Sequence, residues 1–376
     1  MQILPSKNLQ QLPGSNVPIL FGKGSLQFLS RELLPFGSRA LVVSDPGLAA
    51  AGHVDHVMQN LAHAGITAQS FTDLSPNPTT DDVARGLALA QLFQPNVLVA
   101  LGGGSAMDSA KGINFLLTNG GQMSDYWGVD KASRPMLPLI AIPTTAGTGS
   151  DAQSAALITD ALTHRKMACL DKKVLPRFAI LDPTLLITCP RPIRAATALD
   201  ALAHAVETSA ASNRNETSRA FSLSAWALLC PSFGAYVQLR ESPDDRDAML
   251  LGAHLAGAAV KNSMLGSAHA CANPLTELFG LNHGIAVSVM LPHVIRFNSA
   301  LPENHYSDLG ESPEALIDIL YSFLAASGIP TRLALHGVTP DSFEKLAAAA
   351  AQQWTAKFNP RPMTPADFLS LYQNAW

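Results

Sequence analysis

The stretch NVLVALGGGSAMDSAKG (96–112) is the part of the sequence that best indicates the fold. Its opening run, NVLVAL (96–101), is continuously apolar, as expected of a parallel strand that is covered on both faces. Glycines follow the run directly, and the residues after them are expected to begin a helix. A buried strand that passes through glycines into a helix predicts an α/β layer structure around this point.

The first half of the sequence repeats this strand and helix alternation on both sides of the glycines. Buried or strand-like runs are RALVVSD (39–45), AQSFTD (68–73) and LPLIAIP (137–143). Helical spacing is found in VDHVMQNLAHAG (54–65) and in TTDDVARGLALAQLF (79–93), which opens with a Thr/Asp cap. We therefore predict a mostly parallel sheet with helices between its strands.

The pattern changes after FAILDP (178–183), because long Ala/Leu-rich helical patterns dominate from about residue 186 and strand-like runs become scarce. The sequence therefore predicts two domains: an α/β dinucleotide-binding domain over 1–185 and an all-α domain over 186–376. Within the second domain, ESPDDRD (241–247) is interpreted as a charged turn.

Composition excludes several classes of protein. The chain has 376 residues, of which 47% are hydrophobic and only 14% charged, with a net charge of -4. A nucleic-acid-binding surface would be basic, and no apolar run reaches the roughly 18 residues of a membrane span. The N-terminus lacks the pattern of a secretory signal. The scattered cysteines indicate free thiols and a cytoplasmic protein, without a nucleic-acid or membrane partner.

Two glycine-containing loops predict a dinucleotide site. In GGGSAMDSAKG (102–112), backbone without Cβ atoms could approach a pyrophosphate at a helix N-terminus. The segment departs from G-x-G-x-x-G because Met107 occupies one position, and a plain strand-to-helix turn would have the same pattern. PTTAGTGSD (143–151) also follows a predicted strand, and its Thr144, Thr145 and Thr148 hydroxyls suit phosphate or nicotinamide contacts.

Asp45 ends an earlier predicted strand. An acid in that position could bond the adenosine ribose hydroxyls and repel a 2′-phosphate, which would favour NAD over NADP. A turn aspartate before Pro46-Gly47 is the alternative interpretation. The acid precedes the glycines here, whereas in a standard Rossmann unit it follows them.

A metal site is predicted from histidines and one aspartate. Asp200 and His204 stand at i and i+4 of a predicted Ala-rich helix, so their side chains share one face. The pair could simply form a hydrogen bond with each other. His269 and His283, in HACANPLTELFGLNHG (269–284), would complete one Asp and three His, a plausible ligand set for Fe²⁺ or Zn²⁺.

Together these segments resemble the iron-containing (group III) alcohol dehydrogenases, and the resemblance covers nearly the whole chain. The long segment through Asp200 is the most specific, because its Asp, Pro and Glu positions match the family pattern. The segments that carry the resemblance are GGGSAMDSAKG (102–112), IPTTAGTGSD (142–151), AILDPTLLITCPRPIRAATALDALAHAVE (179–207), GSAHACANPLTELFGLNHGIAVSVMLPHV (266–294) and NPRPMT (359–364).

The resemblance implies the dehydroquinate synthase-like fold, with an active site in the cleft between the α/β domain and the helical domain. It also assigns the catalytic metal ligands to Asp200, His204, His269 and His283. The expected cofactor-binding residues, with Asp45 as the ribose-binding acid, are Asp45, Asn77, Gly102, Gly103, Gly104, Ser105, Asp108, Thr144, Thr145, Thr148 and Lys166.

Two departures from the family pattern bear on function. Many members carry HAxxH in the second metal segment, where this chain has Asn273 in place of the second histidine. Since that histidine is a candidate for the proton path, the proton-relay residue is left open. The usual GTGSE is GTGSD here, ending at Asp151, which is a milder change.

The expected activity is hydride transfer between a nicotinamide and a metal-bound primary alcohol or aldehyde, with Fe²⁺ or alternatively Zn²⁺ as Lewis acid. NAD is expected rather than NADP, and a homodimer or higher homo-oligomer is expected. Alternatives are a maleylacetate- or glycerol-type reductase of the same superfamily, a lyase similar to dehydroquinate synthase that uses NAD and metal, and a non-catalytic NAD-binding protein. Net NADH production from simple alcohols would discriminate against the lyase.

Overall fold

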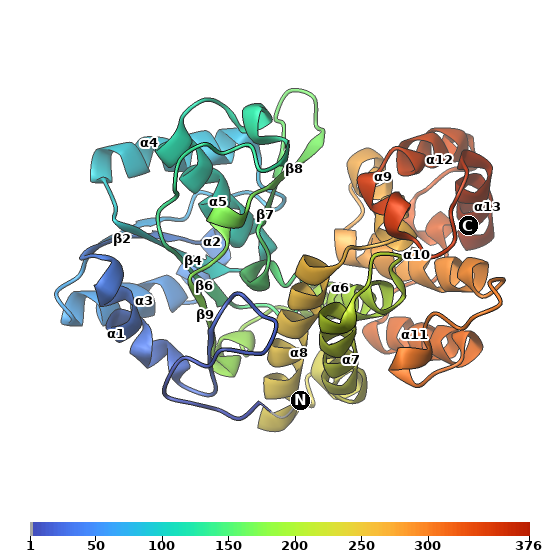
Figure 1. The fold of residues 1–376 in the computed structure, drawn as a ribbon, viewed down its shortest axis with the longest axis horizontal. Coiled ribbons are helices and arrows are strands. Elements are labelled where there is room, and N and C mark those ends of the chain that lie inside the picture. The colour runs from blue at the N-terminus through green and yellow to red at the C-terminus, as the bar shows by residue number, and fades with distance from the viewer. Residues whose placement is uncertain (1–2) are drawn as a thin grey trace. The chain divides into compact units, whose positions relative to one another are not determined.

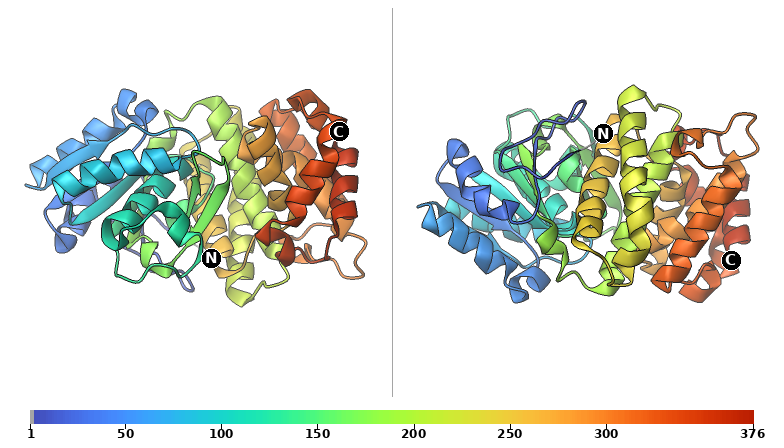
Figure 2. Two further views of the ribbon diagram at one scale, coloured as in Figure 1. Left: turned by 90° about the horizontal axis from the view of Figure 1, so that it is seen from above. Right: turned by 90° about the horizontal axis from the view of Figure 1, so that it is seen from below.

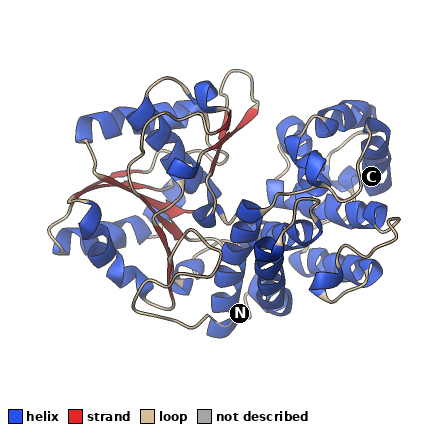
Figure 3. Cartoon of the chain, viewed as in Figure 1, coloured by secondary structure: helices blue, strands red, loops and turns tan. Residues whose placement is uncertain are grey.

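The computed structural model describes residues 3–376 and divides by internal contacts into two compact units. The first unit comprises Met1–Thr145 with Gly149–Cys189, and the helical unit comprises Pro190–Trp376 with Ala146–Thr148. Every strand among the described residues lies in the first unit (Figure 3). The α/β and all-α characters predicted for the two halves are therefore confirmed, and the exact domain limits at 185 and 186 stay a prediction.

The first unit is built on a parallel six-stranded sheet with the order β1-β9-β6-β4-β2-β3. The central strands are buried throughout, which explains why their sequences are continuous apolar runs rather than alternating ones. The strands are β1 (Ile19–Phe21), β2 (Arg39–Val43), β3 (Thr67–Phe71), β4 (Val97–Gly102), β6 (Leu139–Pro143) and β9 (Phe178–Leu181).

Helices cover both faces of this sheet (Figure 1). Leu29 of α1 and Leu61 of α3 join sheet residues such as Val99 in one buried cluster on the first face. On the other face α4 and α5 pack together, and the α4 N-terminus is fixed by a capping box between Thr79 and Asp82. The helices of this unit are α1 (Leu29–Leu33), α2 (Pro46–Ala50), α3 (His53–His63), α4 (Thr80–Phe93) and α5 (Gly104–Asn119).

The strand order reverses direction between β2 and β4. From β2 the chain moves outward to β3 at the sheet edge, then returns to the other side of β2 to form β4 and continues to β6. In open parallel sheets such a reversal opens a crevice at the carboxyl ends of the two strands, where ligands bind. The residues that follow β2 and β4 are therefore the natural place to look for a cofactor site.

A second, three-stranded sheet in the first unit was not predicted. It has the order β5-β8-β7 and consists of β5 (Gly128–Val129), β7 (Ala155–Thr159) and β8 (Lys166–Leu170). Strands β7 and β8 pair antiparallel, and buried residues alternate with partly exposed ones along both. This alternation is typical of a sheet with one solvated face.

The helical unit has no strand among its described residues. Helices α6, α7 and α8 pack against one another, and α10 packs against α6, α9, α11 and α13 (Figure 2). Helix α12 packs against α9 and α13. The helices are α6 (Arg191–Ala210), α7 (Glu216–Val237), α8 (Pro243–Asn262), α9 (Ser267–Phe279), α10 (His283–Asn298), α11 (Pro313–Ser327), α12 (Phe343–Ala351) and α13 (Pro365–Ala375).

Helix α7, Glu216–Val237, is long and apolar enough to cross a membrane by length and composition alone, the one such helix in the described part of the chain. Half of it is buried inside the structure, against α6 and α8 among others. A mostly apolar helix packed between other helices has the pattern of a core helix, so this finding is weak evidence for a membrane span.

The interpretation of residues 241–247 as a turn is wrong in part. Helix α8 begins at Pro243, because Ser242 caps it and exchanges hydrogen bonds with Asp245 in a capping box. The acids that made this segment look like a surface turn are the acids that favour the first turn of a helix.

Candidate functional site

The predicted metal ligands of α6 lie on one face of a helix that is buried along most of its length. Asp200 and His204 are each 4% exposed. Many of their neighbours on α6 are alanines, whose small side chains let other helices approach closely. Asp200 and His204 are therefore placed where a second helix can bring further ligands to them.

Helices α9 and α10 bring the two remaining histidines to Asp200. The Oδ1 atom of Asp200 lies 3.4 Å from Nε2 of His269, 3.6 Å from Nε2 of His204 and 4.0 Å from Nε2 of His283. The His204 and His269 rings stack with their centroids 5.0 Å apart. The three histidines predicted as ligands thus converge on one carboxylate oxygen of the fourth, Asp200.

The ligand atoms of Asp200, His269 and His283 lie close enough together to hold one metal ion, and His204 lies beside them with its Nε2 atom 3.6 Å from Asp200 Oδ1. Ligands ~2.1 Å from a tetrahedral ion lie ~3.4 Å from one another, close to the observed spacing. Asp200, His269 and His283 satisfy the geometry of a three-residue metal site. Asp200 Oδ1 and His269 Nε2 are buried without a regular hydrogen-bond partner. Buried polar atoms are normally paired, so a cation would complete this arrangement.

The electrostatics of the cluster favour an ionised carboxylate. Burial opposes the charge on Asp200, but His204, His269 and His283 outweigh it and hold the pKa of Asp200 well below its ordinary value. Burial lowers the pKa of His204. Burial alone would also lower the pKa of His269, but the Glu207 and Asp200 carboxylates raise that pKa to about 9.

A residue outside the predicted site, Glu207, contacts one of these ligands. Its Oε2 atom accepts a hydrogen bond from Nδ1 of His269 at 2.5 Å. Glu207 was not predicted as a site residue, although it lies on α6 at i+3 from His204 and i+7 from Asp200. That spacing places it on the same helix face and is the signal that could have identified it.

Gly284 allows α10 to reach the metal ligands. A Cβ atom on Gly284 would lie 2.0 Å from the carbonyl oxygen of Ala196 and 3.3 Å from Cβ of Asp200. Glycine is therefore required where α10, which starts at His283, crosses α6. This close approach positions the His283 ring beside Asp200.

Asn273, which replaces an expected histidine, is engaged with another side chain. Its Nδ2 atom donates a hydrogen bond to Oε1 of Gln353 at 3.0 Å. An amide does not ionise near neutral pH, so Asn273 cannot serve as an acid or base as a histidine would.

In the first unit, the glycine-rich segment connects β4 to α5 as predicted. Gly102 has φ 152°, and a Cβ atom there would lie 2.6 Å from Cβ of Ala106. Gly103 is the N-cap of α5 without a side-chain cap, so the first N–H groups of the helix stay available to an anion.

Asp45 lies beside these glycines because β2 and β4 are neighbours in the sheet. Its Oδ2 atom would be 3.5 Å from a Cβ atom on Gly102. Its Oδ1 atom accepts a hydrogen bond from the Leu48 N–H and so caps α2. The two interpretations of Asp45 are thus compatible, since one carboxylate oxygen caps a helix while the other is directed to the glycines.

Several predicted cofactor residues surround this segment. Thr144 donates its N–H to the Gly102 carbonyl at 3.1 Å, and Cβ of a side chain at Gly103 would lie 3.2 Å from Oγ1 of Thr145. The Asn77 N–H donates to Oγ of Ser105 at 3.3 Å. Thr148 groups instead with the helical unit.

Asp108 points into a buried network. Ser150 donates its hydroxyl to Oδ1 of Asp108 at 2.9 Å, and Lys111 donates to the Ser150 carbonyl at 2.7 Å. Burial raises the pKa of Asp108, against the opposing effects of Lys111 and Lys166, and burial lowers the pKa of Lys111 to about 8. This network fixes the 143–151 loop against α5. Lys166, on β8, lies near enough to interact with Asp108.

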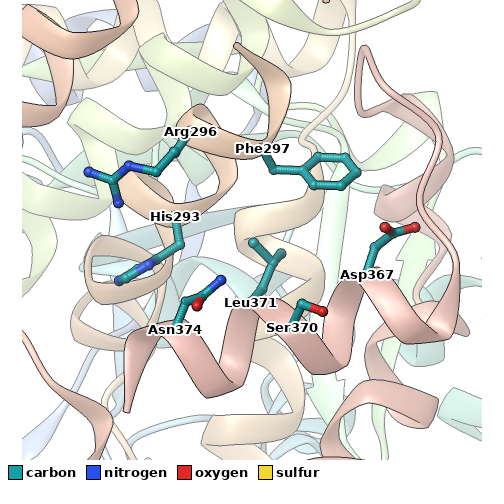
Figure 4. A pocket seen from close by; sticks show the side chains of 7 residues that line it. All are labelled: His293, Arg296, Phe297, Asp367, Ser370, Leu371 and Asn374. Carbon is teal, nitrogen blue, oxygen red and sulfur yellow. The ribbon is translucent and has the colours of Figure 1, made fainter. Parts of the chain in front are cut away.

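A separate surface pocket of about 360 Å³ lies between α10 and α13 (Figure 4). Arg296, His293 and Asn374 gather at one end of it, and Asp367 lies at the other. No residue of the predicted metal or cofactor site lines this pocket.

Comparisons with known proteins agree with this geometry. The family model for iron-containing alcohol dehydrogenase matches residues 16–183, and the model for the C-terminal part of the Fe-containing alcohol dehydrogenase family matches residues 194–376. NAD-dependent methanol dehydrogenase of Bacillus methanolicus is 32% identical over 370 residues, covering 95% of this chain and 97% of the relative.

Two further similarities extend across the chain. Alcohol dehydrogenase 4 of Schizosaccharomyces pombe is 35% identical over 367 residues, and the match covers 95% of this chain and 87% of that relative. A crystal structure of 1,3-propanediol oxidoreductase aligns with a TM-score of 0.92 at 32% identity, over 96% of this chain and 98% of that one. The chain therefore belongs to the iron-containing alcohol dehydrogenase family and is an NAD-dependent, metal-containing alcohol dehydrogenase or aldehyde reductase.

Proposed function

We propose that the protein interconverts a small primary alcohol and its aldehyde with NAD, using one divalent metal ion held by Asp200, His204, His269 and His283. The observation that supports this most directly is the convergence of imidazole nitrogens on one buried carboxylate oxygen, at 3.4 to 4.0 Å. When bound, the metal supplies Lewis-acid polarisation of the substrate oxygen. NAD supplies the hydride acceptor.

The ligand chemistry supports Fe²⁺ as the native metal, with Zn²⁺ as the alternative. Imidazole suits both ions, and one carboxylate offsets part of the charge of a divalent ion. No cysteine belongs to the cluster, so nothing in it selects a soft metal such as Cu(I). Asp200, His204 and His269 are buried, so they would hold the ion where its charge acts more strongly than it would in water.

The first unit is proposed to bind the dinucleotide. The N–H groups at the start of α5 would contact the pyrophosphate, and Asp45 would accept hydrogen bonds from the adenosine ribose. Gly102, Gly103, Gly104 and Ser105 form the loop, and Asn77, Thr144, Thr145 and Lys166 are proposed to contact the cofactor around it. Asp108 would act from the buried network that fixes the loop, and Thr148 from the segment that groups with the helical unit.

Proton transfer is proposed to proceed through water and the ribose hydroxyls, since Asn273 cannot act as a general acid or base. A small substrate suits this scheme, and the names of the relatives include methanol and 1,3-propanediol as their own substrates.

The function is tested by metal analysis of anaerobically purified protein, followed by an NAD-coupled screen of alcohols and aldehydes. We expect one metal ion per chain, net NADH production from a primary alcohol, and loss of activity on chelation that Fe²⁺ reverses. A protein that turns over substrate equally after complete metal removal would contradict the proposal, and so would a reaction without net NADH production.

Asp45→Asn is expected to relax the preference for NAD. Asparagine keeps an oxygen that can cap α2 through the Leu48 N–H, but it removes the charge that would oppose a 2′-phosphate. We expect the ratio of kcat/KM for NADP to that for NAD to rise about tenfold, equivalent to ~1.4 kcal/mol. Asp55→Asn, an exposed change on α3, is the control. A wild-type enzyme that prefers NADP would refute the assignment.

The cellular setting is also a proposal. Cys169, Cys189, Cys230 and Cys271 form no disulfide in the described part of the chain, which suits a reducing compartment such as the cytoplasm. Assembly into a homodimer or a higher homo-oligomer stays a prediction, which light scattering of the purified protein would check.

A further inference from the structure

We propose that Glu207 is a positioning residue of the metal centre, which fixes the tautomer and orientation of His269 and ties that ligand to the N-terminus of α9. The inference rests on the proposed metal function, and it concerns a residue that no predicted ligand set includes.

The contacts of Glu207 account for the first part of the role. Its Oε2 atom accepts from Nδ1 of His269 at 2.5 Å, so the proton of the neutral ring stays on Nδ1. In this neutral tautomer, which a cation would favour by displacing the Nε2 proton, Nε2 has a free lone pair, and it lies 3.4 Å from the Asp200 carboxylate, among the other ligand atoms. A metal-binding histidine needs this tautomer, and a carboxylate on its far nitrogen also makes the ring a stronger donor.

The second oxygen of Glu207 holds the helix that carries His269. Oε1 accepts the N–H of Ala268 at 2.7 Å, one residue before the ligand. The N-cap of α9 is Gly266, which provides no side-chain cap, so Glu207 supplies the cap from α6. One carboxylate therefore fixes both the backbone and the ring of the same ligand relative to Asp200 and His204, which lie on its own helix.

The surroundings of Glu207 restrict its movement. Gly266 packs over it, since a Cβ atom there would lie 3.1 Å from Oε1 of Glu207 and 3.4 Å from Oδ1 of Asn359. Asn359 is itself fixed, because its Nδ2 donates to Oδ1 of Asn298 at 2.7 Å, and Asn298 donates to the Tyr306 hydroxyl at 2.8 Å. Asn359, the first residue of the C-terminal segment 359–364, thus lies near the Glu207 carboxylate beside Gly266.

The burial of Glu207 is costly unless it serves the ligand. The residue is 6% exposed, and its one ion-pair partner among the described residues is His269. A buried carboxylate without an Arg or Lys partner is unfavourable compared with a neutral side chain that could cap α9 equally well. Capping of α9 alone therefore does not account for an acid at this position, and we attribute the acid to its hydrogen bond with His269.

Glu207→Gln tests this proposal against a simple capping role, because glutamine keeps the size of the side chain and an oxygen for the Ala268 N–H. Glu241→Gln is the matched control, since Glu241 is also a buried carboxylate of the helical unit but pairs with Arg194 at 2.7 Å. For each full-length variant we would measure the Co²⁺ dissociation constant, the visible spectrum of bound Co²⁺, NAD affinity and Tm with and without metal.

For Glu207→Gln we expect Co²⁺ to bind about 10- to 100-fold more weakly, with an altered Co²⁺ spectrum, unchanged NAD affinity and a smaller rise of Tm on metal addition. For Glu241→Gln we expect wild-type Co²⁺ affinity. Wild-type Co²⁺ affinity in Glu207→Gln would overturn the proposal. The proposal would also be overturned if the Tm of metal-free Glu207→Gln fell enough to account for the whole loss of Co²⁺ affinity. That result would indicate that Glu207 only caps α9. A wild-type chain that binds no Co²⁺, Zn²⁺ or Fe²⁺ would instead overturn the metal function itself, and this inference with it.

Discussion

Asp200→Asn is expected to abolish stoichiometric metal binding and to lower kcat/KM by about a thousandfold, which corresponds to ~4 kcal/mol of lost transition-state stabilisation. Asp200 is the one carboxylate among the proposed ligands, and its Oδ1 atom is the point on which the three imidazole nitrogens converge. A neutral amide of the same size is a much poorer ligand for a hard divalent cation.

The measurement combines metal content per chain with steady-state kinetics on the best alcohol of the screen. Asp318→Asn, an exposed change on α11 of the same unit, is the control and should keep both values. NAD binding should be unchanged in Asp200→Asn, because the proposed dinucleotide residues other than Thr148 belong to the first unit. Full metal content in Asp200→Asn would show that Asp200 is not a ligand.

Two of the metal ligands, Asp200 and His204, could be predicted from the sequence because their signal is local. Asp200 and His204 are one turn apart on a helix whose neighbours are mostly alanine, so two polar side chains stand out. The positions of His269 and His283 relative to that pair depend on how α9 and α10 pack on α6, which spacing alone does not give. The resemblance to a family supplied that step.

Glu207 was missed because its role depends on a partner from another helix. In sequence it is an acid at the end of an Ala-rich helical pattern, where a solvated position is the usual expectation. Only the packing of α9 brings the His269 ring to it. Asp108 was expected among the cofactor residues, but its buried hydrogen bond from Ser150 was not predicted, because it depends in the same way on a residue distant in the sequence.

The strands of the main sheet were easiest to predict where they form long apolar runs. Strands β4 and β6 are covered on both faces, and their apolar runs are unmistakable. Strands β7 and β8 were not predicted, because half of their side chains are partly exposed and the alternation is short. Strand β1 has three residues, which is too few for a periodic signal.

Gly284→Ala is expected to lower the stability of the helical unit and weaken metal binding together. The new methyl group would lie 2.0 Å from the Ala196 carbonyl oxygen, and a backbone atom cannot move aside as a flexible side chain can. Helix α10 would have to shift away from α6, which costs about 3 kcal/mol or more. Because α10 begins at His283, the same shift would carry that ligand away from Asp200.

The matched control is Gly234→Ala in α7, where a Cβ atom would meet nothing within 4 Å. Since alanine favours a helix interior over glycine, Gly234→Ala should leave Tm unchanged or raise it, with wild-type metal affinity. Gly284→Ala should lower Tm by roughly 10 °C and weaken metal binding, both measured on the full chain. If both variants behaved alike, the close crossing of α10 over α6 would not be what positions His283, and the geometry of the metal centre would have to arise elsewhere in the helical unit.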